Sequence, residues 1–257
     1  MKHLIITGVS KGLGEAVMNH LIESGEDIAL TTIGRSENLR LKAKAEEKGV
    51  SLRFHECDLS AVERINPLME QIFSTMKTPQ ITGLYLVNNA GIVEPVAPLS
   101  KCKSSEILNN LHINLAAPMV LTSAFIRLSE NMSIEKRVAT ITSGASMRAE
   151  YGWSAYCGAK AGVNLFTGCA AVEEQEKEYG VKLIAFSPGI MDTDMQQRIR
   201  KVSNEDFKEV NKFIKYKEEG ELNPPAIVAE KLLQVLFAED ILNGEFISFR
   251  DLVNLEV

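Results

Sequence analysis

The sequence is poor in cysteine, carries no excess of basic charge and contains no long hydrophobic run. Its four histidines are scattered, and its four cysteines show no C-x-x-C spacing, so we expect reduced thiols and neither a disulfide framework nor a metal site. The formal net charge of −6 argues against nucleic acid and anionic membranes as partners. No apolar run reaches the roughly 18 residues of a membrane span, and the first run is too short for a signal peptide, so a cytoplasmic protein is expected.

Two hydrophobic patterns alternate along most of the chain, whose 257 residues are enough for one α/β domain. Apolar, β-branched runs predict strands at residues 3–7, 27–33, 50–57, 82–88, 136–142 and 181–187, with a weaker one at 245–249. Amphipathic patterns predict helices at residues 12–24, 36–48, 61–76, 104–130, 154–178 and 224–238. This alternation predicts a single domain over residues 1–257, with a Rossmann-like, doubly wound, seven-stranded parallel sheet and helices on both faces.

One segment interrupts the alternation. Residues 192–223, between the sixth and the last predicted strand, are mostly polar and charged. An insertion of this length usually serves as a lid or a binding loop. We therefore expect a substrate lid at about residues 190–223, with a solvated pair of surface helices as the alternative.

The first chemical signal is the glycine-rich turn between the first predicted strand and helix, where residues 7–14 read TGVSKGLG. Glycines let the backbone approach a pyrophosphate, and the helix N-terminus offers it free N–H groups and a positive dipole. The strand before the turn and the helix after it supply the context that this motif requires. The cofactor contacts predicted in this turn are Gly8, Ser10, Lys11, Gly12, Leu13 and Gly14.

The end of the second strand distinguishes NADPH from NADH. Enzymes that use NAD usually carry an acid there, which binds the ribose 2′-hydroxyl. This sequence reads TTIGRS at residues 31–36, with Arg35 and no acid. Arg35 can bind a 2′-phosphate through two hydrogen bonds, and Lys11 can reach the same phosphate. NADPH is predicted, and NADH remains the alternative.

The catalytic signal is the pair Tyr156 and Lys160, which share a helix face because they are four residues apart. A nearby ammonium should lower the pKa of the phenol and make it a usable proton donor at neutral pH. Ser143, at the end of a predicted strand, lies 13 residues before Tyr156. Asn114 lies in the helix that follows the fourth strand. Ligands of open parallel sheets bind at the carboxyl ends of the strands, where these segments converge.

This combination of motifs resembles the short-chain dehydrogenase/reductase family over roughly residues 2–250. The resemblance implies that Asp58 contacts the adenine edge and that Asn89 lines the adenosine ribose. It implies that Ser143 orients a substrate carbonyl, that Tyr156 protonates it, and that Lys160 binds the nicotinamide ribose. Reduction of a carbonyl compound by NADPH is the expected activity. The alternatives are an NAD-dependent alcohol dehydrogenase and a non-catalytic, NADPH-binding regulator.

The resemblance assigns further roles at the nicotinamide end. Asn114 would hold a water that connects Lys160 to solvent. The backbone near Ile190 and the hydroxyl of Thr193 would fix the carboxamide. Two long predicted helices, at residues 104–130 and 154–178, have broad apolar faces, which in this family commonly form a four-helix interface. A homodimer or a homotetramer is therefore expected.

Within the family the sequence most resembles the sepiapterin reductase-like branch, which includes bacterial reductases of benzil. The expected substrate is a ketone or dicarbonyl, either a benzil-like diketone or a pterin side-chain ketone. Asp251 matches an aspartate that anchors the pterin in sepiapterin reductases, and a solvated tail carboxylate is the alternative. Tyr151 and Trp153, just before Tyr156, either line an aromatic substrate pocket or simply pack.

Overall fold

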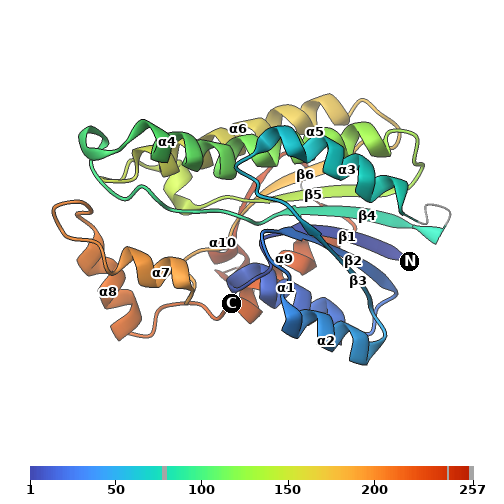
Figure 1. The fold of residues 1–257 in the computed structure, drawn as a ribbon, viewed down its shortest axis with the longest axis horizontal. Coiled ribbons are helices and arrows are strands. Elements are labelled where there is room, and N and C mark those ends of the chain that lie inside the picture. The colour runs from blue at the N-terminus through green and yellow to red at the C-terminus, as the bar shows by residue number, and fades with distance from the viewer. Residues whose placement is uncertain (77–79, 242, 255–257) are drawn as a thin grey trace.

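Seven parallel strands form one sheet in the order β3-β2-β1-β4-β5-β6-β7 (Figure 1). The computed structural model describes residues 1–76, 80–241 and 243–254. The strands are β1 (Lys2–Thr7), β2 (Ile28–Gly34), β3 (Ser51–Glu56), β4 (Gly83–Asn88), β5 (Glu135–Ile141), β6 (Lys182–Ser187) and β7 (Phe246–Ser248). The strand order reverses between β1 and β4, and this switch point is where open parallel sheets bind ligands. The predicted fold class is confirmed.

Helices cover both faces of the sheet, with α3 to α6 on one face and α1, α2 and α9 on the other (Figure 1). The α-helices are α1 (Gly12–Glu23), α2 (Leu39–Lys48), α3 (Ile65–Ser74), α4 (Ser104–Leu111), α5 (Ala117–Ser129), α6 (Ser154–Glu174), α7 (Asp194–Ile199), α8 (Val210–Glu218), α9 (Pro225–Phe237) and α10 (Phe249–Asn254). The helix predicted from residue 36 begins later, because the Asn38 side chain accepts hydrogen bonds from the backbone N–H groups of Arg40 and Leu41 and caps α2.

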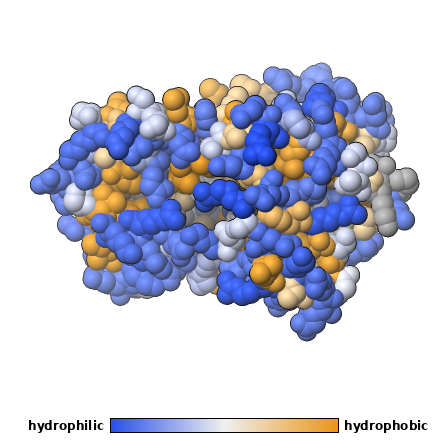
Figure 2. Space-filling model, in the orientation of Figure 1, coloured by the Kyte–Doolittle hydropathy of each residue, from blue (hydrophilic) through white to orange (hydrophobic). Residues whose placement is uncertain are grey.

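The helix predicted at residues 104–130 is not regular throughout. A single π-turn, η4 (His112–Ala116), separates α4 from α5. The stretch Ser104–Ser129 is long and apolar enough to cross a membrane by length and composition, with a mean hydropathy of 1.3 in its most apolar window. In the fold one side of it belongs to the core, since Leu121 and Phe125 are buried together with residues of α3. Figure 2 shows hydrophilic side chains interspersed with apolar ones along this side of the molecule, at the upper edge.

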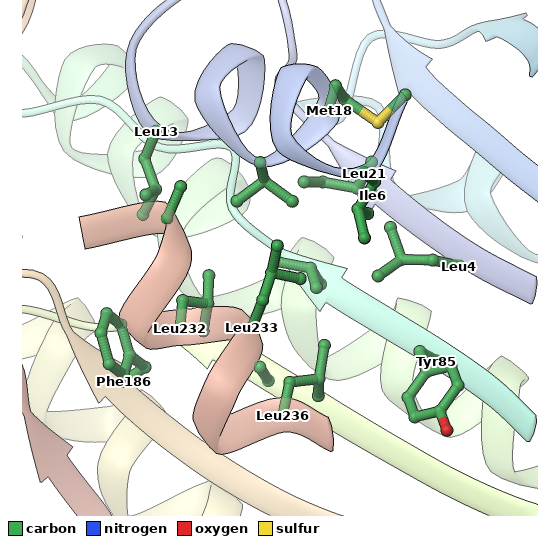
Figure 3. Close-up of a cluster of buried hydrophobic side chains, with 14 of the residues drawn as sticks. Leu4, Ile6, Leu13, Met18, Leu21, Tyr85, Phe186, Leu232, Leu233 and Leu236 are labelled. Carbon is green, nitrogen blue, oxygen red and sulfur yellow. The ribbon is translucent and has the colours of Figure 1, made fainter. Parts of the chain in front are cut away.

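The two core layers follow from the alternation of side chains along each strand. On β1, Leu4 and Ile6 point to the layer under α1 and α9, and Ile5 points to the layer under α3 and α5. Figure 3 shows the first layer, where Leu232 and Leu236 of α9 pack toward the strands. This packing fixes the carboxyl ends of the strands relative to one another.

The segment at residues 190–223 contains α7 and α8 and lies apart from both helical layers (Figure 1). One side of it is buried, because Phe207, Val210 and Phe213 form an apolar cluster with Trp153 and Tyr156. The segment therefore covers the region of the predicted proton donor. Its action as a lid stays a prediction.

Candidate active site at the carboxyl end of the sheet

The glycine turn between β1 and α1 leaves no room for side chains. Gly8 has φ +72°, and a Cβ atom built on it would lie 2.8 Å from the Cα of Ala90. A Cβ atom on Gly14 would lie 2.6 Å from the Asn89 Nδ2 atom. The turn is thus a bare backbone cradle at the start of a helix, and it fits the pyrophosphate of a dinucleotide. Ser10 is exposed in the turn, whereas the Leu13 side chain is buried, so only the backbone of Leu13 can face a ligand.

The end of β4 is bound to this turn. The Asn89 side-chain amide donates to the backbone carbonyls of Thr7 and Gly8 at 2.9 and 2.8 Å. The Thr7 hydroxyl accepts from the backbone N–H groups of Asn89 and Ala90, both at 3.0 Å. Asn89 therefore sets the shape of the glycine turn, and its amide hydrogens are already used. Its predicted contact with the adenosine ribose stays a prediction.

Ser143, Tyr156 and Lys160 lie close together near the carboxyl end of β5. Ser143 follows β5, and Tyr156 and Lys160 lie one turn apart on α6, both buried. The Ser143 side chain is hydrogen-bonded to Tyr156. The Lys160 Nζ atom donates to the backbone carbonyl of Ile141 at 2.8 Å and lies 6.0 Å from the centre of the Tyr156 ring. The structure thus brings together the three side chains predicted to act on a carbonyl.

Burial, rather than the lysine, dominates the pKa of Tyr156. Desolvation raises the pKa of this phenol, and the hydrogen bond with Ser143 acts in the opposite direction. Burial also lowers the pKa of Lys160 to about 8. Burial thus raises the pKa of Tyr156 in this structure, opposite to the lowering expected from Lys160.

Asn114 lies in the π-turn and is fully buried. Its Nδ2 atom donates to the Ile92 carbonyl at 2.7 Å and to the Asn110 Oδ1 atom at 2.9 Å, and its Oδ1 atom accepts from the Ile92 N–H at 3.1 Å. A Cβ atom built on Gly91 would lie 3.0 Å from the Asn114 Oδ1 atom and 3.6 Å from the Lys160 Nζ atom. Asn114 and Lys160 therefore approach the same point. π-Turns in helices are frequent at functional sites.

Asn110 is a site residue that the sequence analysis did not identify. It is fully buried, and its Nδ2 atom donates to the Glu94 carbonyl at 2.6 Å. Through Asn114 it connects α4 to the loop after β4. The available signal was the spacing of four residues between Asn110 and Asn114, which predicts a shared helix face.

Arg35 and Asp58 line an open pocket of about 500 Å³ at the ends of β2 and β3. The Asp58 carboxylate accepts from the backbone N–H and the hydroxyl of Ser60 at 3.0 and 2.9 Å. These hydrogen bonds lower the pKa of Asp58, and the nearby Arg35 and Arg64 lower it further. Arg64, which the sequence analysis did not identify, lines the same pocket.

Lys11 lies elsewhere. Its Nζ atom forms an ion pair with Asp194 of α7 at 2.6 Å, and it does not line the pocket of Arg35. A Cβ atom on Gly12 would lie 3.4 Å from the Thr193 Cγ2 atom, so the glycine turn contacts the start of α7. The Ile190 carbonyl accepts from the backbone and side-chain N–H groups of Asn223 at 2.9 and 3.2 Å. Residues 190–194 thus lie against the glycine turn.

Aromatic side chains surround Tyr156. Trp153 stacks on Phe207 with ring centres 4.5 Å apart and lies edge-on to Tyr156 at 5.5 Å and to Phe213 at 5.4 Å. Trp153 is 4% exposed, whereas Tyr151 is 48% exposed. Of the two aromatic residues considered from the sequence, Trp153 therefore packs beside Tyr156, whereas Tyr151 is largely exposed.

Asp251 lies on the last helix, α10. It is exposed on α10, and it forms no hydrogen bond or ion pair within the part of the chain that the structure describes. The structure does not bring it together with Tyr156. Its predicted role as a pterin anchor stays a prediction.

Known proteins resemble this chain over nearly its whole length. Residues 2–204 match the family of short chain dehydrogenases. The chain is 44% identical to a benzil reductase ((S)-benzoin forming) of Bacillus cereus, covering 96% of this chain and 98% of that protein. It is 28% identical to the sepiapterin reductase of Meriones unguiculatus, covering 96% and 95%. A benzil reductase ((S)-benzoin forming) of Bacillus subtilis is 35% identical, covering 92% and 93%.

Solved structures agree with this assignment. The KRED1-Pglu enzyme superposes with a TM-score of 0.82 at 27% identity, covering 96% of this chain and all of that one. A short chain dehydrogenase/reductase of Saccharomyces cerevisiae gives 0.84 at 25% identity, covering 100% and 99%. The chain therefore belongs to the short-chain dehydrogenase/reductase family of oxidoreductases, in the branch with benzil reductases and sepiapterin reductases.

Proposed function

We propose that the protein is an NADPH-dependent carbonyl reductase that acts on a ketone or dicarbonyl, with Tyr156 as the proton donor. The observation that carries the proposal is the buried Tyr156 hydroxyl, hydrogen-bonded to Ser143 and packed beside Trp153. The 44% identity to a benzil reductase supports reduction of a carbonyl. Arg35 at the end of β2 supports NADPH over NADH.

The cofactor would be held by the glycine turn, by Arg35 and by Lys160. When bound, NADPH supplies the hydride for the carbonyl carbon. The Ser143 and Tyr156 hydroxyls both donate hydrogen bonds to the substrate oxygen, and Tyr156 transfers its proton as that oxygen becomes an alkoxide.

Lys160 then restores the proton of Tyr156. Its pKa of about 8 allows the Nζ atom both to hold and to release a proton near neutral pH. Asn114 would link Lys160 to solvent through a water. Both hydrogens on its Nδ2 atom are used by Ile92 and Asn110, so that water would have to donate to an Asn114 oxygen.

The aromatic side chains around Tyr156 favour an aromatic diketone as substrate. Trp153 packs beside Tyr156, and Phe207 and Phe213 pack against Trp153, so the surroundings of Tyr156 are aromatic and suit phenyl groups. The Trp153 Nε1 atom is buried and has no hydrogen-bond partner among the described residues, so a second carbonyl oxygen that entered this cluster would find a donor there. A pterin side-chain ketone is the second candidate, and it rests on Asp251 and on the 28% identity to a sepiapterin reductase.

We further propose that the protein is a cytoplasmic homodimer or homotetramer. Leu108 of α4, Met119 of α5, and Leu165 and Val172 of α6 are exposed and apolar, and Leu165 is 72% exposed. Exposed apolar side chains gathered on neighbouring helices are typical of a protein–protein interface.

A substrate screen tests the proposed activity. We expect oxidation of NADPH with benzil, slower oxidation with a mono-ketone of similar size, and little oxidation with NADH. Turnover of a pterin ketone but not of benzil would select the second candidate. Oxidation of simple alcohols by NAD⁺ at a higher kcat/KM than reduction of any ketone by NADPH would contradict the proposal.

A further inference from the structure

Two arginines without partners face one pocket. The pocket of about 500 Å³ is lined by Arg35, Glu56, Cys57, Asp58 and Arg64. Arg35 follows β2, and Arg64 ends the short 3₁₀ turn η1 (Val62–Arg64) before α3. Neither guanidinium forms an ion pair or a side-chain hydrogen bond with any residue that the structure describes. Each therefore remains available to a ligand.

Charge balance shows why a single arginine is insufficient here. Glu56 and Asp58 contribute two negative charges to the pocket, and Arg35 contributes one positive charge. With Arg35 alone, the pocket would carry a net negative charge and would repel a phosphate. With Arg64 included, the pocket has two positive and two negative charges. Asp58 is also directed at Ser60, which holds its carboxylate through two hydrogen bonds.

Lys11 is paired with another segment. Its Nζ atom lies 2.6 Å from the Asp194 carboxylate, and Lys11 must leave this pair before it can bind a phosphate. Arg64, in contrast, is close enough to Asp58 to lower the pKa of that carboxyl together with Arg35. The two arginines therefore act on the same part of the pocket.

We propose that Arg64 is the second cation of the 2′-phosphate site, beside Arg35, and that Lys11 instead joins the glycine turn to α7 through Asp194. The assignment rests on the proposed use of NADPH. The ligand group that Arg64 recognises is a phosphate monoester on the adenosine 2′-oxygen. Arg64 thus determines cofactor specificity and takes no part in the transfer of hydride or proton.

Binding measurements on the whole protein test this. Calorimetry gives the Kd of NADPH, of NADH and of 2′,5′-ADP for the wild type, Arg64→Ala, Arg64→Lys, Arg35→Ala and Lys11→Ala. Arg64→Ala should weaken the binding of NADPH and of 2′,5′-ADP by about 5- to 50-fold, a range that allows for solvent exposure of the site. It should change the Kd of NADH by less than about twofold. Arg64→Lys keeps the charge and should retain most of the affinity for 2′,5′-ADP. Lys11→Ala should weaken 2′,5′-ADP less than Arg64→Ala does.

Arg127→Ala is the matched control, because that exposed arginine pairs with Glu70 and does not line the pocket. It should leave all three Kd values unchanged. An equal loss of NADPH and NADH on Arg64→Ala would show that Arg64 contacts adenine and would overturn the proposal. So would an unchanged Kd for 2′,5′-ADP, or a greater loss with Lys11→Ala. A wild type that binds NADH as tightly as NADPH would instead contradict the proposed cofactor.

Discussion

Removal of the Asn110 side chain tests whether the buried amide network holds the active site. Asn110→Ala removes the hydrogen bonds to the Glu94 carbonyl and to the Asn114 Nδ2 atom. Both of these groups then lose a partner inside the protein. An unsatisfied buried polar group costs about 1–3 kcal/mol, so the free energy of unfolding should fall by roughly 2–5 kcal/mol. For a chain of this size that corresponds to a decrease in Tm of about 5–15 °C.

The same change should slow catalysis without abolishing cofactor binding. Asn114 would lose part of its restraint beside Gly91 and Lys160, and small displacements of a catalytic group cost about 10- to 100-fold in rate. Thermal unfolding and kcat for benzil are the assays, with the Kd of NADPH measured in parallel. Asn109→Ala is the matched control, because this neighbouring asparagine is exposed. Equal Tm and kcat values for the two variants would refute the reasoning.

Three further predictions concern charge and assembly. The pKa of Lys160 is lowered to about 8 in the folded protein, so above that pH the unfolded chain binds more protons than the folded protein does. The stability of the wild type relative to Lys160→Met should therefore rise by about 2 kcal/mol from pH 7 to pH 9.5, as denaturant titrations would measure, and a fall would contradict the burial of a charged lysine. Arg35→Asp should reverse the preference in kcat/KM between NADPH and NADH, because the new carboxylate repels the 2′-phosphate and accepts a hydrogen bond from the 2′-hydroxyl. Equal losses of kcat/KM with both cofactors would make Arg35 a scaffold residue. Light scattering at micromolar concentration should show a dimer or tetramer, whereas a single species of 28.4 kDa would contradict the proposed interface.

Local patterns predicted the fold and the catalytic group. The period of the apolar residues predicts the seven strands and the helices that cover the sheet, but not α7, α8 or α10. A helix places Tyr156 and Lys160 on one face whatever surrounds it. Parallel strands bring their carboxyl ends to one edge, so Ser143 could be predicted beside them. These inferences need only backbone geometry.

Other features depend on contacts between distant segments. Lys11 pairs with Asp194, which lies 183 residues away in the sequence, so the glycine turn alone does not show that this lysine is occupied. Arg64 lines the pocket of Arg35 only because η1 brings it to the ends of β2 and β3. The pKa of Tyr156 depends on burial under residues 190–223, and no local motif encodes that burial.

Tyr156→Phe tests the central claim most directly, because it removes one hydroxyl and keeps the ring that packs against Trp153. The measurement is kcat for the reduction of benzil by NADPH, with the Kd of NADPH as a check on the fold. Loss of a general acid costs about 10²- to 10⁴-fold, and we expect a decrease in kcat of this size with an unchanged Kd. A variant that binds NADPH normally and keeps a kcat close to the wild-type value would contradict the assignment of Tyr156 as the proton donor.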